Sequence, residues 1–132
     1  MAMTLFQAIH QYWSEAAALS ALLPAARVTT GPSADPSLPR AVVYPKSDRL
    51  VTQANDGTSV RAVAVQILVF DRDFDDAVNI VEEVKNAFNG ATFDLDYGDS
   101  VIDTVQSDGS AKQQTDGVWQ WTLEFKFTVQ HG

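Results

Sequence analysis

The acidic residues between Asp71 and Glu82 come nearer to a metal site than any other group in this sequence. Asp71, Asp73, Asp75 and Glu82 fall at positions 1, 3, 5 and 12 of a calcium-binding loop. Position 6 of such a loop requires glycine for a sharp turn, and this chain has Asp76 there. An apolar pattern of helical period also runs through the segment. We therefore interpret Asp73 or Asp71 as a helix cap, followed by acids that suit the positive end of the helix dipole, and expect no metal site.

A second acidic run comprises Asp94, Asp96, Asp99 and Asp103. Asp94 and Asp96 would share one face of a short strand, where two carboxyl groups could act as an acid–base pair. The solvent-facing side of a strand beside a turn accounts for the same residues, and we prefer that interpretation.

The remaining residue types offer little chemistry. His10 flanks the apolar stripe of an expected helix, and His131 stands next to the C-terminus, where we expect fraying. Without cysteine or paired histidines, a transition-metal site is not expected. The serines have no nucleophile-elbow context and the glycines form no phosphate-binding run. We therefore assign no catalytic, cofactor-binding or metal-binding residues, and predict that the chain is not an enzyme and needs no cofactor.

Composition narrows the class of protein further. The 132 residues suffice for one domain, 1–132, and the apolar fraction of 45% is typical of globular proteins. The net charge of −8 and the scattered basic residues disfavour specific nucleic-acid binding. No apolar run is long enough to cross a membrane, and we expect no secretory leader. The absence of cysteine fits a reducing compartment.

The strongest structural pattern lies in the last strand, from Trp119 to Val129. Its odd positions are all apolar, and they are Trp119, Trp121, Leu123, Phe125, Phe127 and Val129. Its even positions are polar, so the segment predicts a long strand with one buried and one wet face. The two tryptophans could stack on a ligand, but they share the face of Leu123 and Phe125, which indicates core or interface positions.

The rest of the chain predicts helices alternating with strands. The expected elements are a helix over Leu5–Leu23 with a Thr4/Gln7 capping box, a strand over Ala26–Thr30, a loop over Gly31–Pro39, extended segments at Arg40–Tyr44 and Leu50–Gln53, a hairpin turn at Asn55-Asp56-Gly57, a strand over Thr58–Phe70, a helix over Phe74–Phe88, short strands around Phe93–Tyr97 and Val101–Val105, and an exposed, mobile loop over Ser107–Gly117. Pro45 predicts an edge or a bulge. The expected fold class is α+β, with a mostly antiparallel sheet and two helices packed on one face.

This layout resembles a known family. The segments that carry the resemblance are "LSALLPAARVTTG", "LPRAVVYP", "VRAVAVQILVFD", "FDDAVNIVEEVKNAFNG" and "DGVWQWTLEFKFTVQ". In order, spacing and chain length they resemble the tail-completion or tail-terminator proteins of long-tailed bacteriophages and prophages. Arg40 departs from the family, which more often has an aromatic or apolar residue there.

The resemblance implies a structural protein without catalytic residues. It implies a homo-oligomer, a ring of six subunits that caps the tail tube, stops tube growth and offers a surface to the head–tail connector protein. The partners would be further copies of the chain, the tail-tube protein and the connector, in a virion assembled in the bacterial host cytoplasm. The acidic charge suits this role, because a negative tail lumen would repel the phosphates of passing DNA.

Two other classes of protein also fit the sequence. A small-molecule-binding or enzymatic α+β domain would need convergent polar groups on the faces that point inward, and those faces are almost wholly apolar here. An adaptor of a contractile secretion apparatus would share the fold and differ in its partners.

Overall fold

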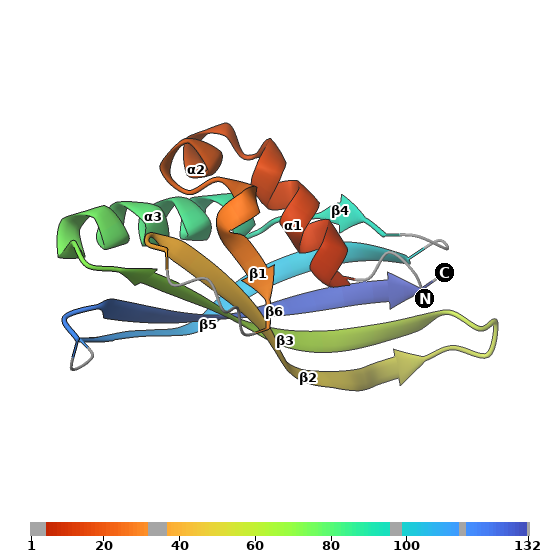
Figure 1. The fold of residues 1–132 in the computed structure, drawn as a ribbon. Coiled ribbons are helices and arrows are strands. Elements are labelled where there is room, and N and C mark those ends of the chain that lie inside the picture. The colour runs from red at the N-terminus through yellow and green to blue at the C-terminus, as the bar shows by residue number, and fades with distance from the viewer. Residues whose placement is uncertain (1–4, 32–36, 96–98, 114–115, 132) are drawn as a thin grey trace.

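The computed structural model describes residues 5–31, 37–95, 99–113 and 116–131 (Figure 1). The elements are α1 (Leu5–Glu15), α2 (Ala17–Leu22), the short 3-10 turn η1 (Ala25–Arg27), β1 (Val28–Thr30), β2 (Arg40–Gln53), β3 (Ser59–Asp71), α3 (Phe74–Phe88), β4 (Phe93–Asp94), β5 (Asp99–Gln113) and β6 (Trp119–His131). None of the helices in these ranges is long and apolar enough to span a membrane.

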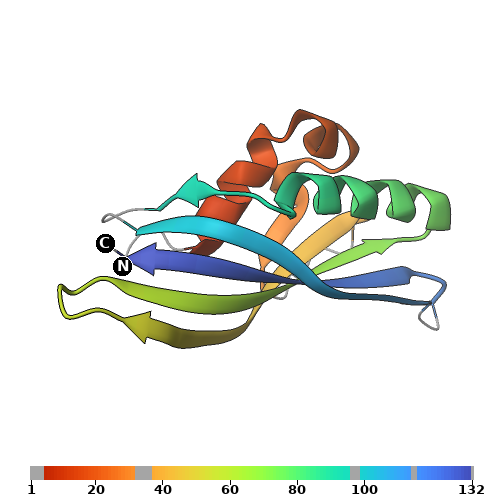
Figure 2. The ribbon, with the colours of Figure 1, turned by 180° about the vertical axis from the view of Figure 1, so that it is seen from behind.

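The strands form one six-stranded sheet in the order β1-β2-β3-β6-β5-β4. Opposite views show a curled sheet with α1, α2 and α3 on the same face (Figures 1 and 2). The predicted α+β class is therefore confirmed in outline. Two details differ: β1 pairs with β2 in parallel, which makes the sheet mixed, and the described residues contain three α-helices instead of two.

The alternating strand β6 lies in the middle of the sheet. It pairs with β3 along its whole length on one side and with β5 on the other. Leu123, Phe125 and Phe127 are buried beneath the helices, as the pattern predicts. Trp121 is only half-buried. Near this end of the strand it packs against Phe74, the first residue of α3, with 5.7 Å between ring centroids, and Phe74 is itself 42% exposed.

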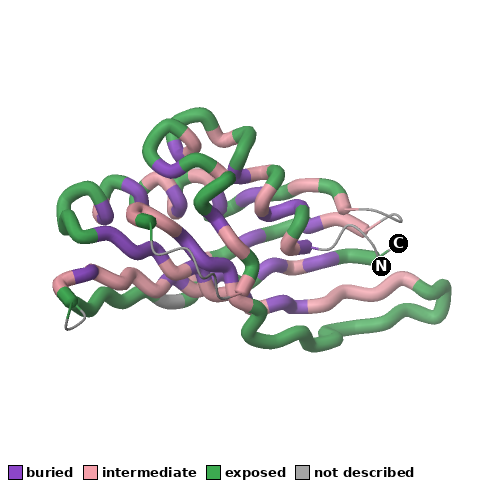
Figure 3. The backbone as a smooth tube through the Cα atoms, viewed as in Figure 1, coloured by how far each residue is buried: buried purple, intermediate pink, exposed green. Residues whose placement is uncertain are grey.

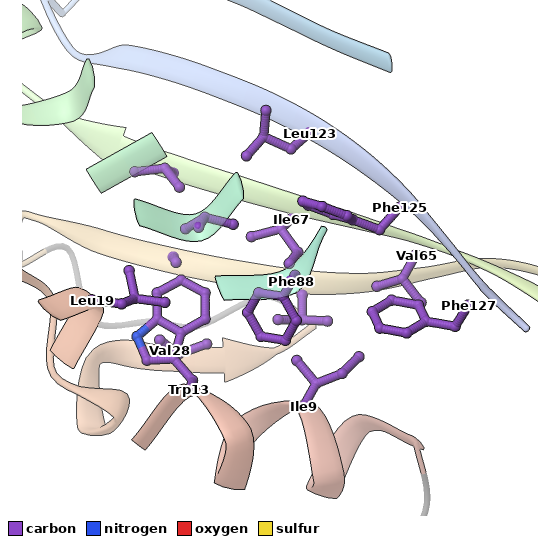
Figure 4. Close-up of a cluster of buried hydrophobic side chains, with 14 of the residues drawn as sticks. Ile9, Trp13, Leu19, Val28, Val65, Ile67, Phe88, Leu123, Phe125 and Phe127 are labelled. Atoms are coloured by element: carbon purple, nitrogen blue, oxygen red, sulfur yellow. The ribbon is translucent and has the colours of Figure 1, made fainter. Parts of the chain in front are cut away.

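The core is organised around Phe88 at the end of α3 (Figure 4). Its ring centroid lies 5.2 Å from that of Tyr12 and 6.0 Å from that of Trp13, both on α1. On the sheet side it lies 6.0 Å from the ring of Phe125 and 6.5 Å from that of Phe127. Buried residues accordingly gather between the helices and the sheet (Figure 3).

The N-terminal helical segment differs from the single helix predicted over Leu5–Leu23. Ala16 adopts an extended conformation and separates α1 from α2. The break is stabilised by tertiary contacts: the Trp13 indole donates a hydrogen bond to the Leu23 carbonyl at 2.8 Å, and the Ser20 hydroxyl donates to the Trp13 carbonyl at 2.7 Å. Thr4, half of the predicted capping box, lies outside the described residues.

The prediction of an exposed loop over Ser107–Gly117 is wrong as far as Gln113. β5 continues to Gln113 and pairs with β6 down to Trp119. The polar composition of this segment gives no strand pattern, and the segment is a strand because it pairs with the backbone of β6. Gly109 sits opposite Leu123, and a Cβ there would lie 3.1 Å from Gln106 Nε2, so a small residue fits this position.

The strand β2 is continuous where two extended segments were predicted. The predicted disturbance at Pro45 is confirmed as a bulge between Pro45 and Ser47. The hairpin turn at Asn55-Asp56-Gly57 is also confirmed, with Gly57 at φ 92°. Hydrogen bonds from the Thr58 hydroxyl and then the Thr58 amide lower the pKa of Asp56.

The burial of β6 leads to a stability prediction. Phe125→Ala should lower the free energy of unfolding by roughly 3–5 kcal/mol, because it removes a fully buried ring and leaves a cavity. The neighbouring Lys126 is exposed, so Lys126→Ala should change stability by less than about 0.5 kcal/mol. Thermal and denaturant unfolding followed by circular dichroism measure both. An unchanged melting temperature in Phe125→Ala would contradict this account of the core.

Candidate assembly surfaces

The acidic residues at Asp71–Glu82 form the end of a strand and the beginning of a helix. Asp73 caps α3, since its carboxylate accepts a hydrogen bond from the Asp76 amide at 3.0 Å. The predicted capping role is thereby confirmed. Asp71 is buried at the end of β3, and Glu82 is 3.5 Å from Lys85 on α3 itself. Among the described residues, no three carboxylate, histidine or cysteine groups are arranged to hold a metal ion.

Repulsion within this cluster is visible at Asp76. The nearby charge of Asp73 raises the pKa of Asp76, with smaller contributions from desolvation and from Asp71 and Asp75. The folded state therefore binds this proton more tightly than the unfolded chain does. This group favours folding below its ordinary pKa, and that contribution is lost as pH rises through the raised value.

The second acidic run is dispersed. Asp94 ends β4, Asp99 begins β5, and Asp96 lies outside the described residues, so the proposed Asp94/Asp96 pair has no described geometry. The Asp99 carboxylate contacts Nδ1 of His131. His131 is the last residue of β6, so the predicted fraying at this position is wrong. Asp103 accepts a hydrogen bond from the Thr104 amide at 2.9 Å.

His10 is held within the fold. Its Nε2 lies 3.0 Å from the Val28 carbonyl and thereby links α1 to β1. This agrees with a helix-flank residue.

The surface contains shallow pockets, and one of them is lined by two carboxylates. A pocket of about 350 Å³ lies against α2 and α3. Its lining consists of Ala21, Leu22, Pro39, Asp71, Asp76, Asn79 and Ile80. Asp71 and Asp76 already serve the junction of β3 with α3, where Asp71 accepts from the Asp73 amide at 3.4 Å and the Asp76 amide donates to Asp73. These contacts favour a structural role for the carboxylates in this pocket.

Exposed aliphatic side chains mark a different kind of surface. Leu50 and Val51 project from β2, and Ile102 and Val105 project from β5; each is more than two-fifths exposed. The sequence pattern did not single these residues out, because each occurs in a polar stretch and two of them stand at bulges. The two groups lie on strands on opposite sides of the central pair β3 and β6.

A comparison with protein families identifies the class. Residues 7–130 match the family model described as tail completion protein gp17. The chain belongs to this family. The membership confirms the resemblance seen in the sequence, and it makes the chain a structural protein of phage tails and virion assembly.

A solved structure shares the fold of this tail completion protein. A chain in the virion of a native gene transfer agent (GTA) particle superposes with a TM-score of 0.69, at 18% identity, over 96% of this chain and 94% of that chain. No curated protein sequence matches this chain.

The capping interpretation gives a prediction about calcium. Asp73→Ala should lower the free energy of unfolding by about 1 kcal/mol through loss of the cap, with or without calcium. Asp73→Asn, which keeps a capping side chain, should retain most of the stability. Calorimetric titration of the unmodified protein should show no calcium binding at micromolar concentrations. Micromolar binding that disappears in Asp73→Ala would overturn the interpretation.

Proposed function

We propose that this protein forms a ring of six copies that ends the tail tube and joins it to the head–tail connector. Membership of the tail completion family over residues 7–130 is the observation that carries the proposal. In this role residues 1–132 act as one non-enzymatic domain, and neither a cofactor nor a metal takes part.

The structure supports a function exerted through surfaces. The polar groups that attracted attention in the sequence serve the fold, since Asp73 caps a helix and His10 joins two elements. Closed rings require two different patches that meet head to tail. The exposed aliphatic residues of β2 and β5 provide two such patches.

The charge of the protein suits the same role. At −8 per chain, a ring would repel the phosphates of DNA passing through it, so no specific nucleic-acid contact and no membrane contact is proposed. The partners are further copies of the chain, the tail-tube protein and the connector protein. The mature location is the virion, after assembly in the bacterial host cytoplasm.

Assembly can be tested in solution. Six acidic copies repel one another at low ionic strength, so self-association should strengthen as salt screens the charge. Light scattering across a concentration and salt series, alone and with the tail-tube protein, should show growth from a 14.4 kDa monomer to a species six times heavier. Monomers under every condition would contradict the proposal.

A further inference from the structure

One face of the sheet is left open over most of its area. The three α-helices of the described residues cover the other face, as opposite views show (Figures 1 and 2). At one end of the uncovered side, Leu38 and Val118 pack with Val42 and Phe70 in a small apolar cluster. No helix of the described residues lies over the rest of that side, which we call the open face. Its side chains are therefore available to a partner.

The pairing register brings two basic residues together on the open face. Arg49 of β2 lies opposite Ala62 of β3, and Lys126 of β6 lies opposite Ala64, one row further along. Residues directly opposite one another project from the same side of a sheet, and Val63, between the two alanines, belongs to the core under the helices. Arg49 and Lys126 therefore point away from the helices. The spacing of strands and residues puts their Cα atoms about 12 Å apart.

These two cations are free of ion pairs within the described part of the chain. Arg49 and Lys126 are both exposed, and no ion pair within the described ranges involves either of them. Their neighbour Lys46 contacts Glu124 on the same face. The other acidic residues of the open face stand on β4 and β5, and they are Asp94, Asp103 and Asp108. The part of the open face formed by β2, β3 and β6 is therefore basic.

The surface between these two cations consists of short side chains. The row across the sheet that contains Lys126 runs from Ser47 through Ala64 to Lys126 and then to Val105. Val105 is 44% exposed and adds apolar surface beside Lys126. Because the side chains of Ser47 and Ala64 are short, a rounded surface such as a helix can approach β3 closely here, with the cations of β2 and β6 on either side.

One stripe of α3 points away from the sheet and is acidic. Steps of four, three and four residues put its exposed members in line, and they are Asp75, Asn79, Glu82 and Asn86. The buried residues of α3 lie on the opposite side of the helix. The one basic residue of α3, Lys85, is 3.5 Å from Glu82. Asp75 and Glu82 are about 10.5 Å apart along the helix axis, which is close to the spacing of the two cations on the open face.

We propose that adjacent copies in the ring pack sheet against helix, with the open face of one copy on α3 of the next. Arg49 and Lys126 of one copy then meet the acidic stripe of its neighbour. The partner is a second copy because the chain itself carries the complementary charges at a matching spacing. The two surfaces differ and lie on opposite sides of each subunit, as a head-to-tail contact that closes a ring requires. This inference rests on the proposed ring and names the surfaces that close it.

This contact is compatible with the net charge of −8. Repulsion between whole acidic subunits acts over long distances and is largely screened beyond about 8 Å at physiological ionic strength. Opposite charges that are in contact and partly buried are screened much less. Added salt therefore removes the repulsion before it weakens the contact, which agrees with the salt dependence expected for the ring.

Charge reversal tests the contact. Lys126→Glu and Glu82→Lys should each weaken self-association roughly ten-fold or more, because each places like charges together. The first makes the chain more negative and the second less negative, so general repulsion predicts opposite effects whereas this interface predicts weakening by both. The double variant should restore assembly. An equimolar mixture of the two single variants should restore it as well, because in an alternating ring every open face meets a stripe of opposite charge.

Lys112→Glu is the matched control for Lys126→Glu. Lys112 is an exposed residue of β5, opposite Gln120, and lies about 20 Å from Lys126 along the sheet. The substitution changes the net charge by the same amount and should alter assembly by about two-fold or less. An equal loss of assembly in Lys112→Glu and Lys126→Glu would show an effect of net charge alone and would contradict the proposed contact.

Crosslinking tests the geometry independently, because the chain contains no cysteine. A variant with both Glu82→Cys and Lys126→Cys, treated with a short bis-maleimide, should give a ladder of linked multimers on a denaturing gel. The two positions lie on opposite sides of one subunit, so a short linker joins them only between copies. Each single variant should remain a monomer, and circular dichroism should show that all three variants are folded. Efficient dimer formation by Lys126→Cys alone would indicate a two-fold contact between open faces and would overturn the proposal.

The failures of the two proposals are distinguishable. Unmodified protein that stays monomeric under every condition overturns the ring and this interface with it. Unmodified protein that assembles, while the charge reversals have no effect and the double-cysteine variant gives no ladder, overturns the interface alone. Loss of binding to the tail-tube protein or to duplex DNA in Lys126→Glu, with self-association unchanged, assigns the open face to that partner and also overturns the interface.

Discussion

Phe88 is the contact on which the rest of the structure depends. It is the last residue of α3, and its ring touches aromatic rings of α1 on one side and of β6 on the other. The alternating strand β6 can bury its apolar face only if helices lie over it, and Phe88 fills the space where the two layers meet. The single layer of helices over a single sheet follows from this packing.

The same packing fixes the surfaces that are left for partners. Because β3 and β5 pair with β6 almost throughout, the relative heights of the outer residues of the sheet are set by hydrogen bonds. β2 is aligned in turn through β3. The sheet thus holds its outer strands in a constant relation, which suits the proposed role as a repeated subunit of an assembly.

The sequence pattern predicted the elements that have one clear apolar face. It missed the features that depend on contacts with other parts of the fold. α3 and β6 were predictable because burial imposes a period that composition shows directly. The polar half of β5 carries no such period and is a strand because β6 offers it a backbone. The break at Ala16 arises from the Trp13 and Ser20 hydrogen bonds, which no local propensity encodes. Asp73 was predictable as a cap from its place before an apolar helix.

Tail length tests most directly whether this protein ends the tail tube, as proposed. Electron microscopy of particles from cells in which only this gene is deleted should show tubes of abnormal, widely varying length that are separated from heads. Restoring the gene in trans should return tails of uniform length joined to heads. Deletion particles whose tails have normal length and remain attached to heads would contradict the account.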